Sequence, residues 1–171
     1  MRIIISPAKK MNVDTDTYRV TGLPMFLEDT KQLMQEIRGL SYSEAKELWK
    51  CNDKLAELNY QRFQDMDLEH GLTPAVLTYE GLQYQHMAPE IFTEEALSYI
   101  EEHLRILSGF YGILKPFDGV TPYRLEMQTK LQTDFGSDLY QFWNDRLYQT
   151  LHSQFEDNTP KELINLASAE Y

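Results

Sequence analysis

A serine and two lysines follow the first apolar run of the chain, and these residue types could carry chemistry. The run Ile3–Ile5 is typical of a buried strand, and Ser6 stops it. A loop beyond the carboxyl end of a strand is the usual ligand position in open α/β sheets. Ser6 and Lys9 have the Ser-x-x-Lys spacing of a serine nucleophile with a lysine base, although no partner motif accompanies them. A second interpretation is that Lys9 or Lys10 binds a phosphate or carboxylate group. A third is that both lysines are simply solvated residues at the end of a strand.

A pair of glycines forms a second candidate site. Gly109 and Gly112 bracket Phe110 and Tyr111. A glycine turn between short helices would let backbone N–H groups approach a phosphate, with Lys115 nearby as a point charge. The competing interpretation is a tight turn that places the two aromatic rings in the core.

Residues 123–127 alternate in polarity. In an extended conformation Tyr123, Leu125 and Met127 share one face. Arg124 and Glu126 share the other, where they form either a site pair or a structural ion pair.

A strand-like run over 163–167 lies near the end of the sequence. Four polar residues lie in or after it: Asn165, Ser168, Glu170 and Tyr171. If this run is parallel to the first strand, its carboxyl end meets the same sheet edge as Lys9. We therefore expect these polar groups to converge with Lys9.

The remaining pattern predicts alternating helices and strands. Helices are expected to begin near Pro24, at Ser41, at Asn52 or Asp53, and at Thr93, and a further one is expected over 139–155 with Asp138 as its N-cap. Further strands are expected over 75–79, 104–107 and 120–127. The first three helices are expected to cover a sheet face. Together these elements predict a single α/β domain over 1–171, with helices packed around a sheet.

The charge is strongly uneven along the chain. The 16 Lys and Arg residues stand against 27 Asp and Glu residues, a net charge of −11. Residues 1–12 nevertheless carry three basic residues and no acid, and residues 103–130 carry four basic residues against two acids. A groove that binds phosphate would have to be built from these two basic islands.

Composition also limits metal and membrane roles. The single Cys51 excludes a disulfide framework and a cysteine zinc site, and the four histidines lack the i,i+4 spacing of a helical metal site. We expect no metal and no cofactor. The sequence has neither an apolar run of membrane-spanning length nor a signal peptide, so we expect a cytoplasmic protein without membrane contact.

Five motifs together resemble the YaaA family of peroxide-stress proteins. They are ISPAK at 5–9, LSGFYGILKP at 107–116, PYRLEM at 122–127, DLYQFW at 138–143 and NLASAEY at 165–171. The resemblance implies a cytoplasmic bacterial protein that limits reactive iron and DNA damage during peroxide stress. It also implies an α/β fold with a positively charged cleft and a helix-hairpin-helix-like element that binds double-stranded DNA. We place that element at 107–116.

Two features depart from the family pattern. Gln128 stands where the family usually has Gly after Leu-Glu-Met. Family members also continue past the final Glu-Tyr with a segment rich in Lys and Arg, so we expect an incomplete domain, about the N-terminal two thirds of a longer protein. Loss of that segment is expected to weaken DNA binding.

Three hypotheses follow. The leading one is a DNA-binding protein without catalytic activity, which contacts DNA phosphates without reading the base sequence. The residues expected to make these contacts are Lys9, Lys10, Gly109, Gly112, Lys115 and Arg124. The second is an enzyme or small-ligand binder at the sheet edge, built from Ser6, Lys9, Arg124, Glu126 and Tyr171. Further polar residues expected at that edge are Tyr123, Ser168 and Glu170. The third, an iron-handling protein, finds no ligand cluster in the sequence. The sequence makes no prediction of oligomeric state.

Overall fold

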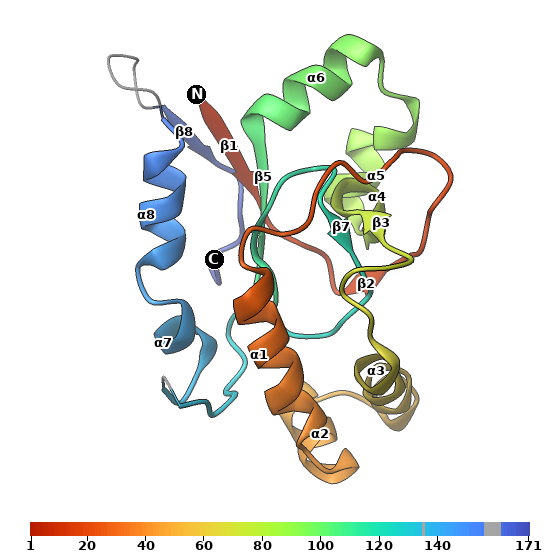
Figure 1. Cartoon of the computed structure of the whole chain (residues 1–171), viewed down its shortest axis with the longest axis vertical. Helices are drawn as coiled ribbons and strands as arrows, with labels where there is room; N and C mark the ends of the chain where they lie inside the picture. The colour runs from red at the N-terminus through yellow and green to blue at the C-terminus, as the bar shows by residue number, and fades with distance from the viewer. Residues whose placement is uncertain (135, 156–161) are drawn as a thin grey trace.

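The computed structural model describes residues 1–134, 136–155 and 162–171 and shows a mixed α/β fold (Figure 1). Its strands are β1 (Arg2–Ile5), β2 (Lys10–Met11), β3 (Thr73–Pro74), β4 (Tyr79–Glu80), β5 (Leu104–Ser108), β6 (Gly112–Leu114), β7 (Gly119–Val120) and β8 (Leu163–Asn165). Its helices are α1 (Leu27–Arg38), α2 (Tyr42–Trp49), α3 (Asp53–Asp65), α4 (Ala75–Thr78), α5 (Leu82–Met87), the 3-10 helix η1 (Pro89–Ile91), α6 (Glu94–His103), α7 (Leu139–Trp143) and α8 (Arg146–Ser153).

The main sheet has the strand order β6-β5-β1-β8. Strand β1 runs parallel to both neighbours, and Ile3 pairs with Leu104 of β5 and with Ile164 of β8. Strand β6 folds back antiparallel to β5. The carboxyl ends of β1, β5 and β8 therefore lie at one edge of the sheet, where ligand sites form in open α/β folds.

Alternate residues of the sheet pack into two hydrophobic clusters. Ile5 and Ile106 belong to the larger cluster. Their neighbours Ile4 and Leu107 pack with Leu151 of α8 in the smaller one. Because successive strand residues point to opposite faces, the sheet has apolar groups on both sides. That pattern explains why Ile3–Ile5 reads as a continuous apolar run.

Helices α1, α2 and α3 form a lobe at the lower end of the molecule in Figure 1. Two caps in this lobe follow the sequence: Ser41 and Glu44 form a capping box on α2, and the Asn52 side chain accepts a hydrogen bond at the start of α3. The lobe packs against the turn between β5 and β6, and its buried residues Leu33 and Phe63 belong to the same hydrophobic cluster as Ile106 of the sheet. The Phe63 ring lies edge-on to Phe110, 5.4 Å away, and Thr30 Oγ1 donates to the Phe110 carbonyl oxygen.

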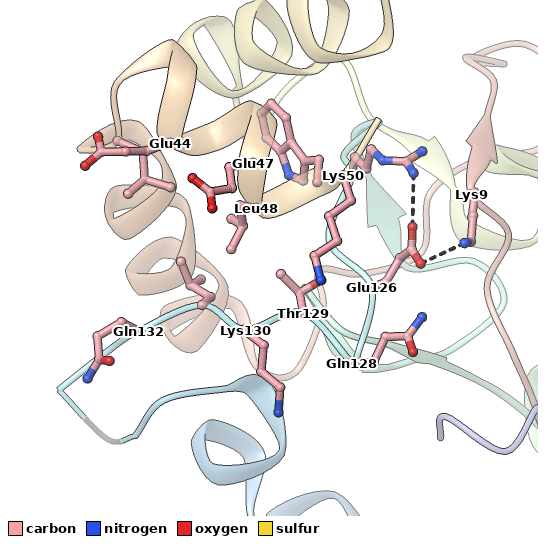
Figure 2. A pocket seen from close by; sticks show the side chains of 14 residues that line it. Lys9, Glu44, Glu47, Leu48, Lys50, Glu126, Gln128, Thr129, Lys130 and Gln132 are labelled. Carbon is pink, nitrogen blue, oxygen red and sulfur yellow. Dashed lines mark hydrogen bonds and ion pairs between the residues drawn. The ribbon is translucent and has the colours of Figure 1, made fainter. Parts of the chain in front are cut away.

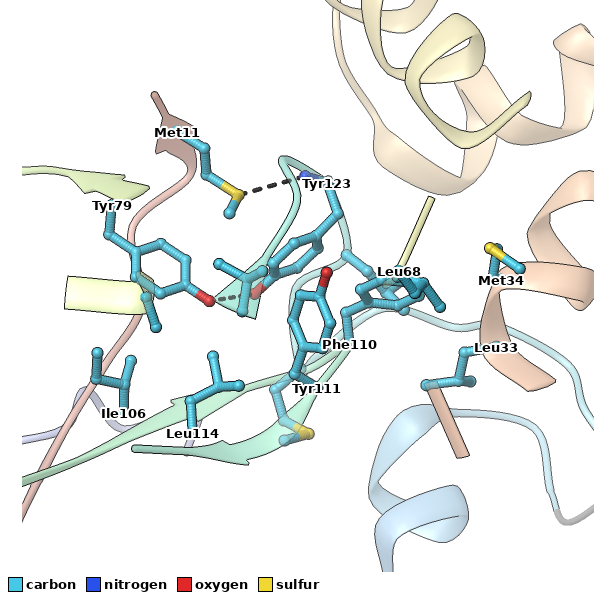
Figure 3. Close-up of a cluster of buried hydrophobic side chains, with 14 of the residues drawn as sticks. Met11, Leu33, Met34, Leu68, Tyr79, Ile106, Phe110, Tyr111, Leu114 and Tyr123 are labelled. Carbon is cyan, nitrogen blue, oxygen red and sulfur yellow. Dashed lines mark hydrogen bonds between the residues drawn. The ribbon is translucent and has the colours of Figure 1, made fainter. Parts of the chain in front are cut away.

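The segment over 107–116 is a β-hairpin, and our expectation of a helix-hairpin-helix-like element there is wrong. Ser108 Oγ accepts hydrogen bonds from the backbone N–H groups of Phe110 and Tyr111, which closes the turn between β5 and β6. Both rings are buried, as the competing interpretation held. Figure 3 shows them beside Tyr123 and Tyr79, whose hydroxyl oxygens lie 3.1 Å apart.

Other sequence-based expectations also need correction. Residues 75–78 form the short helix α4 rather than a strand, and only Tyr79–Glu80 is extended and paired. Of the expected strand over 120–127 only Val120 belongs to one, although buried and half-buried residues do alternate from 123 to 127. The first helix begins at Leu27, not near Pro24. The expected helix over 139–155 is interrupted at Asn144, because its positive φ of 48° is incompatible with a right-handed helix.

Candidate functional site

The loops after β1 and β8 meet at the carboxyl edge of the sheet. Ser6 Oγ lies 3.2 Å from Ser168 Oγ and accepts a hydrogen bond of 2.7 Å from the Ser168 backbone N–H. This contact follows from the parallel pairing of the two strands. Ser6 is therefore joined to Ser168, whereas the Lys9 amine is engaged elsewhere. The structure does not bring the Ser6 hydroxyl and the Lys9 amine together as a nucleophile and its base.

Lys9 instead joins the segment after β7. Its Nζ lies 2.8 Å from Glu126 Oε2, and Arg124 Nη2 lies 3.2 Å from Glu126 Oε1. One carboxylate thus connects two cations that come from different parts of the chain. Arg124 and Glu126 are mostly buried, with side chains 14% and 20% exposed, while Lys9 is 62% exposed.

Glu170 and Tyr171 border the same cluster. Burial raises the pKa of the Glu170 carboxyl, the negative charge of Glu126 raises it further, and Lys9 opposes both effects. Burial also raises the pKa of the Tyr171 phenol, and that of Tyr123 to about 12. Both phenols are therefore neutral hydrogen-bonding groups at physiological pH.

A cavity of about 680 Å³ opens beside this cluster, between α2 and the segment 124–132 (Figure 2). We call it the strand-end cavity. Its charged lining residues are Lys9, Glu44, Glu47, Lys50, Arg124, Glu126 and Lys130. Its remaining lining residues are Leu40, Leu48, Trp49, Gln128, Thr129, Leu131 and Gln132. The volume and the mixture of apolar and polar groups are those of small-molecule sites in proteins.

Two buried N–H donors of the lining lack an acceptor in the described part of the chain. They are Arg124 Nε and Trp49 Nε1. Buried polar groups are almost always hydrogen-bonded, and an unsatisfied one requires an explanation such as an absent ligand or water. A ligand or a water bound in the cavity would bring hydrogen-bond acceptors to these two residues.

Two further lysines border the cavity in different ways. Lys130 Nζ lies 3.0 Å from Asp138 Oδ2. Lys50 makes no ion pair within the described residues, and Figure 2 shows its side chain extending into the cavity towards Thr129. Its left-handed backbone, with φ of 45°, ends α2 and sets the direction of this side chain. Lys50 thus has no ion-pair partner among the described residues, and the same holds for Glu44 and Glu47 of the lining.

The other predicted phosphate contacts lie outside this site. Lys10 pairs with Glu80, and Lys115 lines a separate cavity of about 310 Å³ with Arg105 and Asp118. Gly109 and Gly112 are buried. A Cβ on Gly109 would lie 2.7 Å from the Leu125 carbonyl oxygen, so this glycine permits backbone packing and does not face a ligand.

Sequence reasoning missed the wall of the cavity that α2 supplies. Glu47, Trp49 and Lys50 come from a helix that we expected only to cover a sheet face. Gln128, the departure from the family's glycine, also lines the cavity, but it lies outside α2 and did not indicate this wall.

Metal and membrane roles gain no structural support. Over 1–134, 136–155 and 162–171, no three His, Cys, Asp or Glu side chains come close enough together to hold a metal ion. Among the helices described above, none is both long and apolar enough to cross a bilayer.

Comparison with known proteins identifies the family. Residues 1–171 match the family model described as "Peroxide stress protein YaaA". The whole chain is similar to UPF0246 proteins of Pediococcus pentosaceus (56% identical), Desulfitobacterium hafniense (55%) and Lactiplantibacillus plantarum (54%). It spans 66–67% of the length of these relatives. The chain belongs to the YaaA family of peroxide stress proteins.

Proposed function

We propose that this protein acts in the response to peroxide stress by binding a small anionic ligand in the strand-end cavity. The observation that carries the proposal is the buried guanidinium of Arg124, whose Nε lacks an acceptor beside that cavity. A planar guanidinium binds phosphate and carboxylate groups through paired N–H donors. Lys50 adds an unpaired positive charge to the same space.

The adjacent residues Lys9 and Lys10 allow a controlled test of the anion site. Lys9 lines the cavity, whereas Lys10, the next residue, pairs with Glu80 outside it. Titration calorimetry with pyrophosphate at low ionic strength should show binding that Lys9→Ala weakens about threefold to tenfold, as expected for a partly exposed charge contact. Lys10→Ala should leave the affinity unchanged. Equal losses in both variants, or no binding by the unaltered protein, would contradict the proposal.

Double-stranded DNA is a second candidate ligand, and it is favoured by the family resemblance and by the four cations around the strand-end cavity. Fluorescence anisotropy with a labelled duplex across a salt series tests it. Counterion release predicts that affinity falls steeply with salt and that each lysine or arginine touching a phosphate lowers the salt slope by about one unit when removed. Binding that depends equally on Lys9 and Lys10 would favour DNA over the small ligand.

A further inference from the structure

The lining of the strand-end cavity has an apolar part as well as a charged one. Leu40, Leu48 and Leu131 supply aliphatic side chains, and Trp49 adds an aromatic ring. The Trp49 ring is stacked on Phe63 at 5.8 Å, which fixes the orientation of the indole. These apolar side chains share the cavity lining with the charged residues Glu44, Glu47 and Lys50.

The indole N–H of Trp49 is the second unsatisfied donor of the cavity. Trp49 is 5% exposed, and its Nε1 has no acceptor within the described residues. The other tryptophan, Trp143, donates its N–H to the Gly109 carbonyl oxygen at 2.9 Å. A buried tryptophan normally finds such a partner, so an acceptor is missing beside Trp49.

Groups that form hydrogen bonds come from both sides of the cavity. Gln128, Thr129 and Gln132 belong to the segment 124–132, and the carboxylates of Glu44 and Glu47 belong to α2. Carboxylates accept hydrogen bonds from amino and hydroxyl groups, and amides both donate and accept. The cavity thus combines a site for an anion, an apolar slot and polar groups at the rim.

We infer that the strand-end cavity binds a nucleoside phosphate, with the phosphate at Arg124 and Lys9 and the base in the slot beside Trp49. The inference rests on the proposed function, because it assigns a chemical class to the anionic ligand. A nucleobase supplies apolar faces for the leucines and ring or carbonyl acceptors for the Trp49 N–H. A free nucleotide and the terminal nucleotide of a nucleic acid share this chemistry.

Two-dimensional NMR of the uniformly ¹⁵N-labelled protein tests the inference without any variant. Two tryptophans give two indole N–H signals. Titration with AMP should shift the Trp49 signal and leave that of Trp143 unchanged, whereas pyrophosphate should shift neither. Binding of AMP with the Trp49 signal unmoved would overturn the inference.

The variant Trp49→Phe supplies an independent readout, because it keeps the aromatic ring and removes the N–H. Its affinity for AMP should fall about twofold to tenfold, the effect of one hydrogen bond. Its affinity for pyrophosphate should not change, and its melting temperature without ligand should be equal or higher, because an unsatisfied buried donor is gone.

The outcomes separate the two proposals. If pyrophosphate binds and AMP binds no better, or if Trp49→Phe binds AMP as tightly as the unaltered protein, the nucleotide assignment is wrong and the anion site stands. If neither probe binds, both proposals fail. A 5′-phosphorylated oligonucleotide that binds better than AMP, with the same dependence on Trp49, would support the assignment and identify a nucleic-acid end as the source.

Discussion

The Glu126 carboxylate lies 2.8 Å from the Lys9 ammonium and thereby forms an ion pair with a cation that an anionic ligand would use. Its other oxygen contacts Arg124. An incoming phosphate must share these two cations with Glu126 or displace it. Glu126 therefore competes with any anion at the strand-end cavity.

Removing that competing charge should strengthen anion binding. Glu126→Gln should raise the affinity for pyrophosphate about fivefold, since a partly exposed ion pair contributes up to about 1 kcal/mol. Glu80→Gln is the matched control, because Glu80 pairs with Lys10 outside the cavity and its loss should change nothing. Titration calorimetry measures both. Weaker binding by Glu126→Gln would show that Glu126 positions the ligand or its cations.

Gly109 should be required for folding. A Cβ there would lie 2.7 Å from the Leu125 carbonyl oxygen and 2.9 Å from the Met127 backbone nitrogen. Because backbone atoms cannot move aside easily, Gly109→Ala should lower the free energy of unfolding by about 1–3 kcal/mol. Gly39→Ala, at a site with a right-handed backbone and looser contacts, is the control and should be nearly neutral. Equal urea midpoints for the two variants would refute the close packing.

Ionisation of the Asp118 carboxyl should lower the free energy of unfolding as pH rises. Burial raises the pKa of this carboxyl to about 6, against the opposing effects of the Lys115 backbone N–H and charge. A carboxyl whose pKa is higher in the folded than in the unfolded state stabilises the fold below the unfolded pKa, and that contribution is lost as pH rises through the folded pKa. Relative to Asp118→Asn, the unaltered protein should lose on the order of 2 kcal/mol between about pH 4 and pH 6.

Urea unfolding of both proteins at several pH values measures this difference. The comparison with Asp118→Asn is needed because other carboxyls change stability in the opposite direction. Hydrogen bonds from Ser41, for example, lower the pKa of Glu44. A difference between the two proteins that does not vary with pH would contradict the assignment to Asp118.

The capping box of α2 should support the cavity wall. Ser41→Ala removes the side chain that accepts the Glu44 backbone N–H, and it should lower the free energy of unfolding by about 1 kcal/mol. Ser43→Ala is the matched control, because Ser43 is an exposed residue inside the same helix and alanine is the better helix former. Thermal melts that show the same loss for both variants would contradict the role of the cap.

The sequence predicted the sheet edge better than it predicted the cavity. Two short apolar runs predicted a first and a last strand, and the meeting of Ser6 with Ser168 follows once these two strands pair in parallel. The α2 wall could not be predicted, because its position depends on distant contacts: Trp49 of α2 stacks on Phe63 of α3, which in turn lies against Phe110. The spacing of residue types along the sequence does not predict such long-range contacts.

Local patterns also gave wrong predictions where tertiary contacts decide the conformation. The run 75–79 is largely apolar, and a short apolar run fits a strand and a buried helix equally well. Here Thr78 Oγ1 donates to the Pro74 carbonyl oxygen, and a helical turn results. The glycines of the β5–β6 hairpin suggested a phosphate site, but Ser108 closes that turn from inside the core.

The most direct test of an anion site at the sheet edge observes the Arg124 Nε–H group itself. NMR spectra of arginine Nε–H signals, with the Arg124 signal assigned from Arg124→Lys, should be recorded during a pyrophosphate titration. An acceptor that reaches the unsatisfied Nε should shift the Arg124 signal strongly, and the signal of Arg38, whose Nε already donates to the Phe63 carbonyl oxygen, should stay in place. An unmoved Arg124 signal at pyrophosphate concentrations that saturate the protein would contradict the assignment of the site.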